Sequence, residues 1–145
     1  MGPTKRGKGT KIMVIADEGS LPVAVSVASA SPHEVTLAEE TLARRFVSKN
    51  TARLVADRAY DSDPLDAALL KQGVVLIAPH RSNRVSPVTQ DGRPLRSYKR
   101  RWKIERTNAW LQNWRKLVTR YEYLLDNFLA MVKLACIMLL FRRYF

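Results

Sequence analysis

The chain has 145 residues, and its 25 Lys and Arg against 13 Asp and Glu give a formal net charge of +12. A hydrophobic content of 46% with 26% charged residues is typical of one globular domain with a core. The single cysteine, Cys136, excludes a disulfide within the chain and fits a reducing compartment. The cationic excess makes a polyanion the expected partner, nucleic acid first, although ribosomal and membrane-surface proteins share this balance.

Neither end of the sequence predicts secretion or a membrane span. The first eleven residues, MGPTKRGKGTK, have no apolar segment after their charges, so they are not a secretory signal. Residues 128–141 are strongly apolar, but Lys133 interrupts them and they are shorter than the roughly 20 residues that a span needs. We therefore expect a buried helix there, with a membrane anchor as a minor alternative, and a cytoplasmic protein.

The first half of the chain predicts a hairpin followed by a helix. Residues 1–10 are rich in Gly, Lys and Arg and predict a flexible basic arm or the tail of a loop whose beginning is absent. Residues 11–16 and 21–30 are apolar and β-branched, and the Gly-bearing turn between them predicts an antiparallel hairpin. Ser31 is expected to cap a helix that ends near residues 48–50, and His33 is expected to be a polar helix-start residue rather than a ligand.

A parallel crossover is expected next. Residues 52–56 predict a short buried strand, a helix follows from about Asp63 to Lys71, and residues 74–78 predict another strand. Asp57 stands at the C-terminal end of the first of these strands, where ligands gather in open α/β sheets. Its alternative role is that of a turn aspartate that caps the next backbone segment. Residues 79–95 are expected to form a loop.

A strongly basic helix is expected over residues 97–120. Nine cations lie between Arg96 and Arg120, against one anion, Glu105. Four apolar residues at helical spacing predict a stripe that faces the core, and five polar residues form a second stripe. The apolar stripe is Trp110, Trp114, Leu117 and Tyr121, and the polar stripe is Tyr98, Arg101, Glu105, Asn108 and Gln112. Glu105 is either a surface salt-bridge partner or a metal ligand beside a phosphate track. A last, apolar helix begins at Asn127.

Several segments together resemble insertion-sequence transposases with a DDE catalytic core, and the insertion sequence five family most of all. The resemblance rests on DRAYDSDPLD (57–66), on APHRSNR (78–84), and on the long segment from Tyr98 to Ala130. The opening GPTKRGKGTKI and the segment ASPHE are similar too, so the likeness covers nearly the whole chain. It implies an α/β fold, an RNase H-like mixed sheet flanked by helices, over residues 11–145.

The resemblance also implies a catalytic set that this sequence carries only in part. Members of the family hold divalent metal, usually Mg²⁺ with Mn²⁺ as an alternative, through three carboxylates. The second matches Asp57, and the third matches Glu105 in the signature Tyr98-x2-Arg101-x3-Glu105; Gln112 departs from the later basic position. The first aspartate is expected on a strand upstream of residue 1. We therefore expect the C-terminal part of a transposase, either a truncated product or a second reading frame fused by frameshifting.

The implied partner is DNA, both the element's ends and its target, with a homo-oligomer in the active complex near the bacterial nucleoid. The residues expected to contact DNA are Tyr98, Arg100, Arg101, Lys103, Arg106, Arg115 and Lys116. Trp102, Trp110 and Trp114 are expected in the core rather than stacked on bases. Two other function classes stay open. One is a catalytically inactive DNA-binding regulator, and the other is a basic ribosomal-type protein in which Asp57 and Glu105 are incidental.

Overall fold

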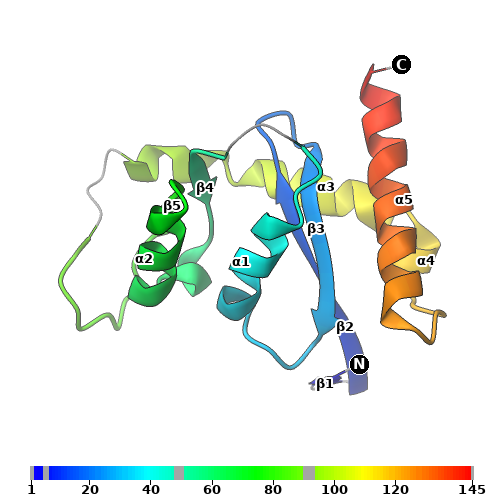
Figure 1. Cartoon of the computed structure of the whole chain (residues 1–145), viewed down its shortest axis with the longest axis horizontal. Helices are drawn as coiled ribbons and strands as arrows, with labels where there is room; N and C mark the ends of the chain where they lie inside the picture. Colours follow the sequence, from blue (N-terminus) through cyan, green and yellow to red (C-terminus); the bar gives the residue numbers. More distant parts are fainter. Residues whose placement is uncertain (1, 5–6, 48–50, 90–93, 145) are drawn as a thin grey trace. The chain divides into compact units, whose positions relative to one another are not determined.

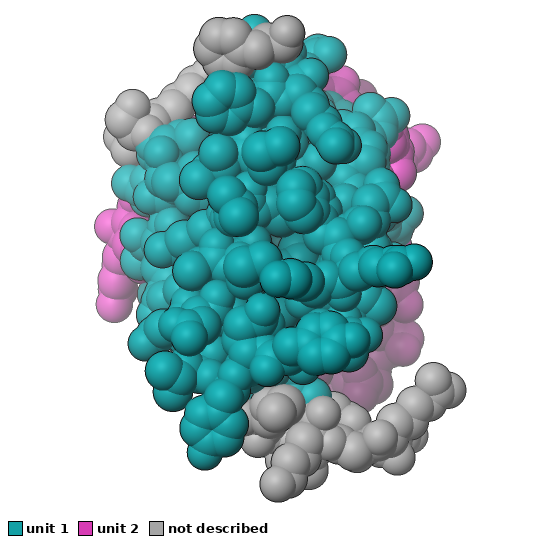
Figure 2. Space-filling model, turned by 90° about the vertical axis from the view of Figure 1, so that its right-hand side faces the viewer, with its two compact units in different colours: residues 1–47, 103–145 teal, residues 48–102 magenta. Residues whose placement is uncertain are grey.

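The computed structural model describes residues 2–4, 7–47, 51–89 and 94–144. The chain divides into two compact units. The first unit comprises residues 1–47 and 103–145, and the second comprises residues 48–102 (Figure 2). Both units contain strands and helices (Figure 1), so the predicted α/β class is confirmed.

The first unit is built on a three-stranded antiparallel sheet in the order β1-β2-β3. Its strands are β1 (Gly2–Thr4), β2 (Gly7–Ala16) and β3 (Pro22–Ser29). The predicted hairpin is confirmed, since β2 and β3 pair from Thr10↔Ser29 to Ala16↔Pro22. Asp17 shapes its turn, because Oδ1 accepts hydrogen bonds from the amides of Gly19 and Leu21. The expected basic arm, residues 1–10, overlaps β1 and the first part of β2.

Two helices use opposite faces of β3. Val25 packs into the apolar cluster that includes α5 (Leu125–Tyr144), whereas the neighbouring Ser26 side chain meets Thr41 of α1 (Glu34–Ala43), with 2.7 Å between their hydroxyl oxygens. Successive residues of a strand point to opposite faces, so α1 and α5 lie on opposite sides of the hairpin, as Figure 1 shows.

The predicted bounds of the first helix were wrong at both ends. His33, not Ser31, occupies the N-cap position, and no side chain caps the helix there. The helix ends at Ala43 rather than near residues 48–50, which lie outside the described residues. The chain leaves the helix early because Arg45 bridges to Ala24 and the Phe46 amide donates to the Val23 carbonyl. His33 is confirmed as a helix-start residue.

The prediction of a single basic helix over residues 97–120 was also wrong. The structure has a 3-10 helix η2 (Pro94–Arg100), then α3 (Trp102–Gln112) and a short α4 (Arg115–Val118). The chain leaves α3 at residues 113–114, where Trp114 is extended and becomes the N-cap of α4. Tyr98 therefore does not share an α-helix with Glu105. The expected apolar stripe holds for Leu117, but Tyr121 is 78% exposed.

The last helix, α5, begins at Leu125, two residues before the expected start. One face is buried, with Phe128, Val132 and Cys136 each at most 1% exposed. The opposite face is apolar but exposed, so the expected buried helix is buried on one side only. The exposed apolar residues there are Leu134, Ile137, Met138, Phe141 and Tyr144. Among the described residues, no helix has the length and apolarity to cross a membrane.

The second unit contains the predicted crossover. β4 (Arg53–Val55), η1 (Arg58–Tyr60), α2 (Asp63–Lys71) and β5 (Val75–Ile77) follow one another, and β4 and β5 pair in parallel. Gly73 ends the helix region with a φ of 76°, a conformation that favours glycine. The expected burial of β4 was wrong, since Arg53 and Val55 are exposed and Leu54 is half-buried. The single mixed sheet of an RNase H-like fold stays a prediction.

Candidate active site and cationic surface

Asp57 follows β4 directly and begins the turn η1. Its side-chain Oδ1 accepts a hydrogen bond of 2.8 Å from the Ala59 amide, so Asp57 is the N-cap of η1. This is the capping role that the sequence left open as an alternative. The bond occupies only one carboxylate oxygen. Among the residues that the structure describes, Oδ2 has no hydrogen-bond partner, so a capping role and a metal-ligand role are compatible.

Glu105 lies in the first turn of α3 and is exposed. The helix that carries it is fixed from the opposite side. Thr107, with no exposed surface, donates from Oγ1 to the Ser20 carbonyl in the β2–β3 turn at 2.6 Å, and Leu111 is buried in the apolar cluster with α5. The backbone at Glu105 is therefore fixed by contacts within the first unit, while the Glu105 carboxylate is exposed at the surface.

Asp57 belongs to the second unit and Glu105 to the first, so their predicted convergence stays a prediction. Within the described residues, no group of three or more His, Cys, Asp or Glu side chains has the arrangement of a metal site. Two further aspartates of the second unit, Asp61 and Asp63, have another role.

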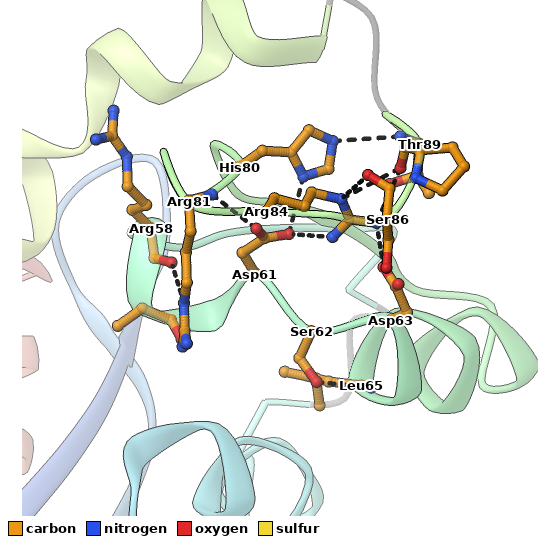
Figure 3. Close-up of polar contacts among 12 residues, drawn as sticks. Arg58, Asp61, Ser62, Asp63, Leu65, His80, Arg81, Arg84, Ser86 and Thr89 are labelled. Atoms are coloured by element: carbon orange, nitrogen blue, oxygen red, sulfur yellow. Dashed lines mark hydrogen bonds and ion pairs between the residues drawn. The ribbon is translucent and has the colours of Figure 1, made fainter.

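Asp61 is the centre of a polar network in the second unit, shown in Figure 3. Its side chain is only 6% exposed. One oxygen, Oδ1, lies 2.8 Å from Nδ1 of His80 and 2.7 Å from Nη1 of Arg84, and Oδ2 accepts from the Arg81 amide at 2.7 Å. Arg84 also contacts Asp63, whose side chain is 48% exposed. The carboxylate thus ties the residue after η1 to the loop after β5.

Three further hydrogen bonds hold the loop after β5, two to η1 and one within the loop. The Arg81 guanidinium donates to the Ala59 carbonyl at 2.6 Å and to the Arg58 carbonyl at 3.4 Å. The Thr89 amide donates to Nε2 of His80 at 3.2 Å. Because Nε2 accepts, the proton of a neutral His80 lies on Nδ1, where it is donated to Asp61. The network thus fixes the conformation of a segment for which the sequence predicted only a loop.

The electrostatics of this network shift two carboxyl groups in opposite directions. Burial acts to raise the pKa of Asp61, but the Arg81 amide, the His80 ring and the Arg84 guanidinium together outweigh burial and lower the pKa below its ordinary value. Burial and the neighbouring charges of Asp63 and Asp61 raise the pKa of Asp66. Asp61 is therefore a stable anion at neutral pH, as its role of acceptor for three donors requires.

The residues expected to contact DNA are mostly open to solvent. Arg100, Arg106, Arg115 and Lys116 are exposed, and Tyr98, Arg101 and Lys103 are half-buried. In the second unit, the Arg101 guanidinium lies 5.6 Å from the centre of the Tyr98 ring, which orders both side chains. In the first unit, Arg106 stands similarly over Trp110 at 5.9 Å.

Other members of the basic segment have structural roles. The Arg120 guanidinium donates to the Glu122 and Tyr123 carbonyls and to Oγ1 of Thr10. These bonds stabilise the turn before α5, so Arg120 has a structural role. Trp110 and Trp114 pack against the apolar cluster, as expected, whereas Trp102 is 47% exposed. A hollow of about 330 Å³ is lined by Trp114, Arg115, Lys116, Leu117 and Met131.

A family model described as a transposase DDE domain matches residues 2–140. The chain belongs to this family. It is 30% identical over 143 residues to a Burkholderia cepacia protein named "Putative transposase for insertion sequence element IS402". That match covers 92% of the chain and 64% of the relative, so the chain spans less than two thirds of the relative's length. No solved structure matches the chain. The resemblance to insertion-sequence DDE transposases is confirmed, while membership of the insertion sequence five family stays a prediction.

Sequence reasoning on this DDE domain missed the network around Asp61. Its members entered only as parts of the segments DRAYDSDPLD and APHRSNR within the resemblance. The partners are 19 to 23 positions apart, so no local pattern joins them. One signal was available, because residues that leave parallel neighbouring strands at the same edge of a sheet are expected to meet.

Proposed function

We propose that this chain acts in DNA transposition, as the C-terminal part of a DDE transposase that cleaves and joins DNA strands with a divalent metal. The observation that carries the proposal is the position of Asp57 in a chain of this family. Its carboxylate stands at the end of a parallel strand, is oriented through Oδ1, and keeps Oδ2 for a ligand.

Asp57 and Glu105 are the proposed metal ligands, with a third carboxylate on a segment outside these 145 residues. Carboxylate oxygens are suitable ligands for Mg²⁺, and also for Mn²⁺, which could replace it. Mg²⁺ keeps several water ligands when few protein ligands hold it. The exposed Glu105 and the open oxygen of Asp57 fit that donor chemistry. When bound, the metal would stabilise charge on the attacking and leaving oxygens of an in-line displacement at phosphorus.

Basic residues of both units would bind and orient DNA. Arg100, Arg106, Arg115 and Lys116 offer exposed cations for phosphates, a contact that is independent of base sequence. Arg101, held over the Tyr98 ring, presents donors that suit a phosphate or a neighbouring carboxylate. We propose the element's ends and its target as the DNA partners, with a homo-oligomer as the active assembly in the bacterial cytoplasm.

An RNase H-like sheet is part of the same proposal. On the side away from β3, β2 has a strand partner only at Gly7–Gly9, and β4 has a strand partner on one side only, within the described residues. Open strand edges carry unpaired amides and carbonyls that favour a further strand. We propose that one more strand, bearing the first aspartate, pairs with an open strand edge of this kind.

The proposal is tested by Mg²⁺-dependent nicking of DNA that carries the element's ends, with a protein extended upstream of residue 1. Asp57→Asn and Glu105→Gln in that extended protein are expected to abolish nicking. Glu18→Gln and Asp126→Asn remove exposed carboxylates of the same two types from a turn and from α5, and they are expected to leave the rate unchanged. Equal nicking by all four variants contradicts the proposal.

The alternative is a DNA-binding regulator without strand cleavage. The exposed cations favour it as a second function because they need no third carboxylate to bind phosphates. Under this alternative, the 145-residue chain binds duplex DNA and competes with a full-length transposase, and Asp57→Asn leaves that competition unchanged.

A further inference from the structure

The turn that begins at Asp57 is fixed at both ends. At its start, the Asp57 side chain accepts from the Ala59 amide. At its end, Asp61 is the C-cap of η1, and its backbone amide donates to the Arg58 carbonyl at 3.3 Å. A turn of three residues has few bonds of its own, so its shape depends on what holds the two caps.

The second cap is held by the loop that follows β5. The Asp61 carboxylate is 6% exposed and meets the Arg81 amide, the His80 ring and the Arg84 guanidinium (Figure 3). Bonds between a charged group and its partners are stronger than neutral ones, and water competes little at a side chain this buried.

Arg81 adds a second connection between the same two segments. Its amide is fixed by Asp61, and its guanidinium reaches the carbonyls of Ala59 and Arg58 inside the turn. The guanidinium is exposed, so these bonds are weaker than those of the buried carboxylate. The order of importance that follows is Asp61 first and Arg81 second.

We infer that Asp61 is a positioning residue for Asp57. By clamping the end of η1 to the loop after β5, it fixes the Ala59 amide that orients the Asp57 carboxylate, and Arg81 supports the same turn. The inference rests on the proposed role of Asp57 as a metal ligand, and it adds a group that touches neither metal nor DNA.

Amide hydrogen exchange of the 145-residue chain tests the clamp without any metal. Asp61→Asn keeps the shape of the side chain but cannot accept through its amide nitrogen, so one of the three donors loses its partner. We expect exchange at Ala59 to be about tenfold faster, the factor for the loss of one hydrogen bond to a charged group. Exchange at Ala56 and Val75, whose amides pair β4 with β5, is expected to stay the same.

Two further variants make this experiment decisive. Arg81→Ala keeps the buried carboxylate and is expected to give a smaller rise at Ala59, again without a change in the strands. Asp63→Asn is the matched control, because Asp63 also meets Arg84 but lies beyond η1 and is half-exposed. A uniform rise at all amides after Asp61→Asn, or an equal rise after Asp63→Asn, overturns the inference.

Mn²⁺ binding separates this inference from the proposed function. In the unchanged chain, Mn²⁺ is expected to broaden NMR signals around Asp57, and Asp57→Asn is expected to remove that effect. Asp61→Asn is expected to raise the required Mn²⁺ concentration about 10–100-fold, as for other groups that orient a ligand. If Asp57→Asn leaves the broadening intact, the metal role is wrong. If Asp57→Asn removes the broadening but Asp61→Asn leaves the Mn²⁺ requirement unchanged, the positioning role is wrong.

Discussion

The hydroxyl of Thr107 anchors the helix that carries Glu105, and its removal gives a direct measure of that anchor. Thr107→Val keeps the branched shape and volume while it deletes one oxygen. The residue has no exposed surface, and its Oγ1 lies 2.6 Å from the Ser20 carbonyl and 3.1 Å from the Lys103 carbonyl. A hydroxyl has one proton, so the shorter contact is the principal bond.

The expected cost follows from burial. Ser20 is 1% exposed, so its carbonyl loses a partner that water is poorly placed to replace. Leaving a buried acceptor unpaired costs about 1–3 kcal/mol, whereas Thr and Val differ little in helix propensity. We therefore expect Thr107→Val to lower the free energy of unfolding of the first unit by about 1–3 kcal/mol.

A matched variant controls for the chemistry of the substitution. Thr36 also donates from its hydroxyl to a backbone carbonyl, that of His33 at 2.7 Å, but it is exposed. Thr36→Val is expected to change stability by no more than about 0.5 kcal/mol, as for other surface substitutions. Urea denaturation at unchanged m-value measures both. Equal effects of the two variants would refute the argument that burial of the Thr107 bond anchors α3.

Three further outcomes follow from the same structure. The folded-state pKa of Asp61 is below its ordinary value of 3.8, so the stability that the Asp61 carboxylate contributes is fully present above pH 3.8 and is lost as pH falls through the folded-state pKa. Asp61→Asn should therefore flatten the acid dependence of the free energy of unfolding of the second unit. Replacing Arg100, Arg101 and Lys103 with Ala should make the slope of log affinity for duplex DNA against log salt concentration shallower, by up to about 0.9 for each phosphate that is no longer neutralised. An unchanged slope would mean that other residues bind the phosphates. Burial raises the pKa of Cys136 to about 11, so a thiolate-directed reagent should label it at pH 8 only as fast as the first unit opens; fast labelling of the native chain would contradict its burial.

The sequence predicted elements whose signals are local. The apolar, β-branched residues of β2 and β3 and the Gly-bearing turn between them were sufficient for the hairpin. Ser62, Pro64 and Gly73 bound α2 as capping rules require. The predicted end of α1 failed because a tertiary contact ended it, since Arg45 pairs with Ala24 across the sheet. No propensity in the sequence marks that position.

The basic segment shows the same limit. Residues 97–120 contain no Gly or Pro, and their periodicity continues across the break at residues 113–114. The chain turns there so that Trp114 and Leu117 pack with α5, a contact that depends on residues far along the chain. Arg120 counted as a surface cation in the sequence, but its three bonds to Thr10, Glu122 and Tyr123 give it a structural role.

The sequence predicted the elements that carry the two candidate ligands, but not the contacts that hold these elements in place. The position of Asp57 after a parallel strand and of Glu105 in a helix could be anticipated from spacing and from the resemblance. The side chains that fix the Asp57 turn could not, because Asp61 and Arg84 meet only when the loop after β5 folds back on η1. Local periodicity carries no information about such a loop.

The central claim is that Asp57 and Glu105 hold one divalent metal, and local cleavage of the polypeptide by bound Fe²⁺ tests it most directly. With Fe²⁺ in place of Mg²⁺ in the extended protein, hydroxyl radicals made at the bound ion cut the backbone only nearby. The account predicts cuts beside both residues in the same sample, and the loss of both sets in Asp57→Asn alone. Cuts at one of the two positions only, or cuts at Glu105 that persist in Asp57→Asn, would contradict it.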